Sequence, residues 1–172
     1  RDAAWVGALE ALRAASSQGG EPSKKLFSAA ARACGQGRRW DQALGLLRHM
    51  QLHGPELDVI MCGAVLGACE KGQQWELALG LLKDMRHLEL VPNVVVFNIA
   101  ISACEKGAAW LPAVGLLAEM RGRRCVPDTI SYGAALLACE HGLAWECAVR
   151  VLEEMRPQGA VPNIACYFRA VR

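Results

Sequence analysis

The chain has 172 residues, of which 53% are hydrophobic and only 6% aromatic, and its formal net charge is +2. The apolar residues are mainly Ala, Leu, Val and Cys, a composition that favours closely packed helices over β-strands. The small net charge does not by itself indicate a nucleic-acid binder, and the longest uncharged run, 90–104, is shorter than the about 20 apolar residues that a membrane-spanning helix needs.

A period of 35 residues organises the chain, because tryptophan, cysteine, glycine and methionine each recur at this interval without an insertion. The recurring positions are Trp5, Trp40, Trp75, Trp110 and Trp145; Cys34, Cys69, Cys104 and Cys139; Gly37, Gly72, Gly107 and Gly142; and Met50, Met85, Met120 and Met155. Periods of about 20 to 50 residues are typical of solenoids, whose units bury their apolar faces against one another. The pattern predicts an all-α fold, an α-solenoid of antiparallel helix-turn-helix repeats.

In chain order, the period divides the sequence into complete and partial repeats. Residues 1–23 form a partial repeat in which Trp5 opens the second helix, so a first helix is expected upstream of the chain. Complete repeats follow at 24–58, 59–93, 94–128 and 129–163. Residues 164–172 begin another first helix, and the chain is therefore expected to be a section of a longer array.

The repeat at 94–128 illustrates the elements expected in each unit. Residues 94–106 are apolar on more than one face and are followed by Gly107, a common end to a helix. A second helix is predicted over 110–121, with Pro112 in its first turn, where the absent N–H costs nothing. Residues 122–127 form the loop to the next unit.

The eight cysteines predict core packing rather than a metal site or a disulfide framework. No CxxC pair is present, and a free cysteine commonly behaves as a small buried hydrophobe. No cofactor is expected. No catalytic constellation is recognisable either, so the chain is not expected to be an enzyme; the recurring glutamates Glu70, Glu105 and Glu140 are expected to be solvated.

Several local motifs distinguish this solenoid from others. Repeats close with Pro92-Asn93, Pro127-Asp128 and Pro162-Asn163, although the first complete repeat ends Leu57-Asp58. The tryptophan opens the second helix, which continues into Gly-Leu-Leu-x-x-Met at 80–85 and 115–120. As a set, these motifs resemble the pentatricopeptide repeat family. The resemblance implies a right-handed superhelix that binds single-stranded RNA at about one base per repeat.

The resemblance also implies which residues select each base, namely the fifth residue of the first helix together with the last residue of the repeat. The implied pairs are Ser28 with Asp58, Gly63 with Asn93, Asn98 with Asp128, and Gly133 with Asn163. The first pair would favour guanine and the third uracil, whereas the two glycine pairs depart from the family pattern. Alternatively, Asp58, Asn93, Asp128 and Asn163 are only helix N-caps. Asn98 favours the RNA interpretation, because asparagine is unfavourable inside a helix.

Two further rows of residues fit an RNA-binding groove. Ile60, Val95 and Ile130 occupy the second position of their repeats, where the family places an apolar side chain that wedges between bases; Lys25 departs from this pattern. Ordinary packing at the helix start is the alternative. Lys71, Lys106 and His141 recur at the end of the first helix, with Gln36 in the earliest repeat. This row could track phosphates, or it could simply complement the helix dipole.

Two functions are therefore compatible with the sequence. The first is an RNA-binding module in organellar RNA processing, stability or translation, located by resemblance alone in a mitochondrion or plastid, since no targeting segment is visible. The second is a helical-repeat scaffold whose concave face holds a peptide or another subunit. Neither interpretation involves a membrane or a small-molecule substrate.

Overall fold

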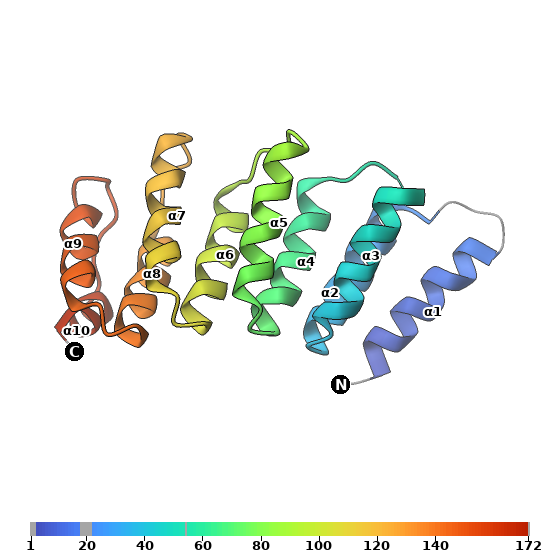
Figure 1. Ribbon diagram of the computed structural model, residues 1–172, viewed down its shortest axis with the longest axis horizontal. Coiled ribbons are helices and arrows are strands. Elements are labelled where there is room, and N and C mark those ends of the chain that lie inside the picture. The colour runs from blue at the N-terminus through green and yellow to red at the C-terminus, as the bar shows by residue number, and fades with distance from the viewer. Residues whose placement is uncertain (1–2, 18–21, 54, 172) are drawn as a thin grey trace. The chain divides into compact units, whose positions relative to one another are not determined.

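The computed structural model describes residues 3–17, 22–53 and 55–171, and in these ranges the chain forms ten α-helices (Figure 1). Residues 1–2, 18–21 and 172 of the predicted partial repeats, and residue 54, lie outside the description. The helices are α1 Ala3–Ser17, α2 Lys24–Gln36, α3 Trp40–His53, α4 Val59–Lys71, α5 Trp75–His87, α6 Val94–Lys106, α7 Trp110–Gly122, α8 Thr129–His141, α9 Trp145–Met155 and α10 Ile164–Val171. Within the described ranges, none of these helices combines the length and apolarity needed to cross a bilayer.

The helices fall into two compact units, 1–91 with α1 to α5 and 92–172 with α6 to α10. Inside each unit, the first helices of successive repeats pack directly on one another, α2 on α4 in the first unit and α6 on α8 and α8 on α10 in the second. Three second helices pack between two first helices of their own unit, α3 between α2 and α4, α7 between α6 and α8, and α9 between α8 and α10. The predicted antiparallel helix pairs are therefore present in both units.

Small residues allow the first helices to approach closely. Ala30, Ala31 and Cys34 of α2 and Ala68 of α4 are all fully buried. A Cβ atom at Gly35 would lie only 3.2 Å from the Cα atom of Ala68. The apolar residues that α2 and α4 carry on several faces are thus buried by contacts on several sides.

The shared period of tryptophan and glycine has a packing cause. Three tryptophans lie against the glycine that ends the first helix of the following repeat, namely Trp5 against Gly37, Trp40 against Gly72 and Trp110 against Gly142. A methyl group at Gly37 would lie 2.7 Å from Cδ1 of Trp5, and methyl groups at Gly72 and Gly142 would overlap the rings of Trp40 and Trp110 in the same way. Glycine recurs because the indole ring occupies the space that a side chain would need.

These glycines do cap the first helices, as predicted, but they do not provide the left-handed residue that commonly ends a helix. Gly72 has a φ of −82°, and the left-handed residue is the next one, Gln73, with a φ of 58°. The N–H of Gln74 then donates to the carbonyl of Cys69 over 2.9 Å, which closes a Schellman-type turn.

The second helix of the repeat at 94–128 was predicted to end at Arg121. It extends one residue further, because α7 ends at Gly122.

Six of the eight cysteines are buried in the core, as the sequence predicted, whereas Cys125 and Cys147 are half-buried. The four periodic cysteines, Cys34, Cys69, Cys104 and Cys139, are fully buried. Burial raises the pKa of the Cys69, Cys104 and Cys139 thiols to about 11. These side chains are therefore neutral hydrophobes at physiological pH.

Candidate nucleic-acid interface

The last residue of each complete repeat caps the helix that follows it. The side-chain oxygen of Asp58 accepts from the N–H of Met61 over 2.8 Å, and that of Asn93 accepts from Val96 over 3.0 Å. Asp128 and Asn163 make the equivalent bonds at 2.8 and 3.0 Å. The capping role is therefore confirmed at all four positions. It occupies one side-chain atom and leaves the second carboxylate oxygen or the amide nitrogen for another contact, so capping and base selection can coexist.

In the second unit, Asn98 and Asp128 are brought together although they are 30 residues apart. The Nδ2 atom of Asn98 donates to Oδ1 and Oδ2 of Asp128 over 3.2 and 3.3 Å. Ser131 completes the cluster, because its hydroxyl donates to Oδ1 of Asn98 over 2.5 Å and accepts from the N–H of Asp128 over 3.1 Å. The predicted pair is thus a connected polar group at the start of α8.

Asp128 is ionised in this cluster. Burial alone raises its pKa, but hydrogen bonds from the Ser131 N–H, the Ser131 hydroxyl and the Asn98 amide together hold the pKa of the carboxyl below its usual value. An ionised carboxylate only accepts hydrogen bonds. Asp128 therefore presents a fixed negative acceptor at physiological pH.

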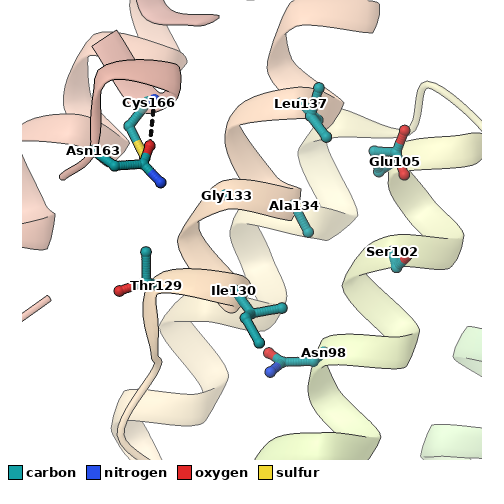
Figure 2. Close-up of a pocket in the computed structure, with 10 residues that line it drawn as sticks. All are labelled: Asn98, Ser102, Glu105, Thr129, Ile130, Gly133, Ala134, Leu137, Asn163 and Cys166. Atoms are coloured by element: carbon teal, nitrogen blue, oxygen red, sulfur yellow. Dashed lines mark hydrogen bonds between the residues drawn. The ribbon is translucent and has the colours of Figure 1, made fainter. Parts of the chain in front are cut away.

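A groove of about 360 Å³ crosses the surface of α8 in the second unit. Figure 2 shows Asn98, Ser102 and Glu105 on α6 facing Ile130 and Ala134 on α8. Gly133 also lines the groove, and Asn163 lies on the other side of α8, before α10 (Figure 2). Three of the predicted base-selecting residues and one predicted wedging residue therefore share a single concave surface.

The predicted wedging residues are exposed. Ile60, Val95 and Ile130 are 64%, 63% and 68% exposed, although all are β-branched aliphatic residues. This exposure contradicts the alternative that they are packed at the helix start. An apolar side chain that remains open to solvent on a groove wall can contact an added ligand.

The predicted phosphate-contacting residues are also on the surface, but an acidic side chain lies beside one of them. Lys71, Lys106 and His141 are exposed at the last positions of α4, α6 and α8. His141 places Nδ1 3.5 Å from Oε1 of Glu105, whose side chain is only 15% exposed. The recurring glutamates Glu70, Glu105 and Glu140, which were expected to be solvated, are half-buried.

In the two base-selecting pairs of the earlier repeats, Ser28 with Asp58 and Gly63 with Asn93, the described residues show no bond between the side chains of the two partners. Ser28 is 5% exposed and its hydroxyl donates to the carbonyl of Lys25 over 3.1 Å, so Ser28 would have to release this bond to donate to a base. Gly63 belongs to the first unit and Asn93 to the second, and each is half-buried or exposed within its own unit. Sequence reasoning missed Ser131, whose only signal was a polar residue at a position that is otherwise apolar.

The family models and solved structures that match the chain agree with one another. Residues 45–106 match the pentatricopeptide repeat domain, and residues 26–55 match the PPR repeat. No curated protein sequence matches the chain. The chain is 27% identical in sequence to the pentatricopeptide repeat protein PPR10, in the structure of its complex with an 18-nt psaJ RNA element, and the two folds match with a TM-score of 0.77. That match covers 97% of this chain and 24% of PPR10, so the chain spans about a quarter of the length of that protein.

Two further solved structures share the fold. PPR10 from maize matches with 21% identity and a TM-score of 0.76, over 97% of this chain and 24% of that one. The PPR domain of Arabidopsis thaliana protein-only RNase P 1, solved in complex with tRNA, matches with 18% identity and a TM-score of 0.75. That match covers 86% of this chain and 78% of the domain. The predicted α-solenoid class is confirmed.

Proposed function

Because this chain belongs to the pentatricopeptide repeat family, we propose that it is a single-stranded RNA-binding module in which each repeat contacts about one base. The observation that carries the proposal is the groove over α8, where Asn98, Ile130, Gly133 and Asn163 line one surface. PPR10 and the RNase P domain were both solved with RNA bound.

The proposed base selection follows the pairs set out above. Asn98 with Asp128 is proposed to favour uracil and Ser28 with Asp58 to favour guanine. The pairs that contain Gly63 and Gly133 have no side chain at the fifth position, and they are proposed to contribute spacing rather than strong selection. An array of this length would therefore discriminate at two positions separated by one unselective position.

The remaining contacts are proposed to be independent of sequence. Ile60, Val95 and Ile130 would wedge against base faces, a contact that tolerates any base. Lys71, Lys106 and His141 would lie along the phosphates. If these three cations each neutralise one phosphate, the slope of log affinity against log salt is about −2, from about 0.7 per contact.

We further propose that the chain acts by binding and not by catalysis, in organellar RNA processing, stability or translation, in a mitochondrion or plastid. This part of the proposal rests on the family resemblance alone. Direct evidence would be colocalisation of the full-length protein with an organellar marker.

The test is selection from a randomised RNA pool by the purified chain at two salt concentrations. The expected result is enrichment of RNAs that carry a guanine and a uracil separated by one variable base, with an affinity that falls with salt. Asn98→Ala combined with Asp128→Ala should remove the uracil preference. The protein should stay folded, because losing one N-cap costs about 0.5–2 kcal/mol. Absence of RNA enrichment together with salt-insensitive behaviour would refute the proposal.

A protein-interaction scaffold is the second candidate, and one observation favours it. The first unit has a hollow of about 440 Å³ lined mainly by Met50, Pro55, Leu57, Leu88 and Leu90. Apolar side chains of this kind are typical of the buried centre of a protein interface. A chain that enriches no RNA but binds a protein partner through this hollow would support the scaffold instead.

A further inference from the structure

Ser131 is an unusual residue for its place in the fold. It is the third residue of α8 and fully buried, and the equivalent third residues of the other first helices are Leu26, Met61, Val96 and Cys166. Burying a hydroxyl is unfavourable unless it is hydrogen-bonded. Ser131 meets this requirement entirely through the proposed base-selecting pair, Asn98 and Asp128.

The bonds within this cluster determine how the Asn98 amide is turned. The carboxylate of Asp128 can only accept, so it requires the Nδ2 atom of Asn98. The Ser131 hydroxyl then donates to Oδ1 of Asn98, at 2.5 Å. The same hydroxyl proton has a second acceptor within reach, Oδ1 of Asp128 at 3.0 Å, but the bond to Asn98 is the shorter of the two. The backbone N–H of Asp128 donates to the hydroxyl oxygen over 3.1 Å. Asn98 is thus held from both ends of its amide.

We propose that Ser131 is a third specificity-determining residue of this repeat, which fixes the Asn98 amide so that it offers an N–H, and not its carbonyl oxygen, to an RNA base. The inference rests on the proposed RNA-binding function and deepens it. One Nδ2 hydrogen is used by Asp128, and the second is left for the groove that Asn98 lines. Ser131 itself is buried and acts only through Asn98.

The direction of this hydrogen bond separates the two pyrimidines. Uracil and cytosine have the same size, but uracil has an acceptor oxygen at position 4 and cytosine has an amino donor there. A fixed N–H favours uracil. An amide that turned over would instead offer its carbonyl oxygen to the cytosine amino group. Asp128 opposes this turn because its carboxylate would face an oxygen, and Ser131 adds to that selectivity because its hydroxyl would lose its nearer acceptor.

The experiment compares two short RNAs that differ only by uracil or cytosine at the position that the wild-type chain selects from a random pool. Ser131→Ala should lower the ratio of the uracil to the cytosine affinity about two- to tenfold, which is the factor that one net hydrogen bond represents. Ser131→Cys places at this position the residue that α10 already carries there, and a thiol is a weak donor. This second variant should also lower the ratio, and it covers the case in which the alanine variant folds poorly.

Val96→Ala is the matched control, because it removes the γ atoms from the same buried position of the preceding first helix, at a residue that does not line the groove. It should leave the uracil-to-cytosine ratio unchanged. A second readout needs no RNA. In the NMR spectrum of the free chain, the side-chain amide signals of Asn98 should shift more in Ser131→Ala than in Val96→Ala.

The outcomes separate this inference from the proposed function. If the wild-type chain binds no RNA, the function itself is wrong. If it binds RNA without distinguishing uracil from cytosine, or if Ser131→Ala keeps the wild-type ratio, the role of Ser131 is refuted and RNA binding stands. An equal loss of ratio in Val96→Ala would also refute it, since general loosening of the fold would then explain the effect.

Discussion

Substituting Gly72 with alanine tests whether the tryptophan–glycine contact sets the repeat. Gly72 has a φ of −82°, a value that any residue adopts, so alanine meets no backbone strain. Its methyl group would instead overlap the ring of Trp40. Overpacking of this kind costs about 1–3 kcal/mol. The alanine also reduces the entropy of the unfolded chain, which returns about 0.4–1 kcal/mol, so a net destabilisation of about 1–2 kcal/mol is expected.

Gly80→Ala is the matched control in the same unit. Gly80 lies inside α5 and is exposed, and a Cβ atom there would have no neighbour within 4 Å. Alanine is the better helix former by about 0.5–1 kcal/mol, so this variant should be more stable than the wild type. For a chain of this size, a change of 1 kcal/mol in the free energy of unfolding shifts Tm by about 2–4 °C. The Tm values of the two variants should therefore differ by about 5–10 °C.

The assay is thermal unfolding followed by circular dichroism, with tryptophan fluorescence as a second probe. If the two probes give the same transition, the chain unfolds in a single step and its Tm reports one free energy of unfolding. This has to be checked, because repeat arrays do not always unfold in one step. A shift of Gly72→Ala in the same direction as Gly80→Ala would refute the packing argument. The shared 35-residue period of tryptophan and glycine would then need another explanation.

Three further predictions follow from burial and charge. Ile130→Ser should change the free energy of unfolding by less than about 0.5 kcal/mol, because the side chain is 68% exposed, and it should weaken the affinity for the RNA that the wild-type chain selects. The pKa of Asp128 is lowered by folding, so its charge stabilises the native state above its unfolded pKa, and this contribution is lost as pH falls through the folded value. The stability difference between wild type and Asp128→Asn, measured by urea unfolding, should therefore shrink below about pH 4 and stay constant at higher pH. With a maleimide at pH 7, the half-buried Cys125 and Cys147 should be labelled before the buried Cys69 and Cys104, whose pKa values are about 11; equal labelling rates at all four thiols would contradict the core assignment.

The helices were predictable from the sequence because their ends are set by local chemistry. Asn93 caps α6 and Gly107 ends it at the residues that the sequence indicated. The reason for the glycine was not predictable in the same way. It depends on Trp40 reaching Gly72 across 32 positions, a contact that only the packed structure brings together.

The groove was predictable in outline and not in detail. The 35-residue period places Asn98, Ile130 and Gly133 at related positions of successive first helices, and the structure places all three on one surface. The exposure of Ile130 could not be read from its type, because an isoleucine at a helix start is equally compatible with packing. The Ser131 bond to Asn98 links residues 33 apart, and its distance and direction follow from how α8 lies on α6.

The capping bonds limit how this interface can vary. The last residue of a repeat must accept from a backbone N–H of the next helix, as Asp128 does from Ser131 over 2.8 Å, and few side chains do this well. Asp and Asn both do, and all four repeats use one or the other, so this position can exchange a carboxylate for an amide without losing its cap. The fifth residue has no such duty, and it is free to be Ser28, Gly63, Asn98 or Gly133. A change in base preference is therefore least costly to the fold at the fifth residue, except where a buried partner such as Ser131 has been matched to it.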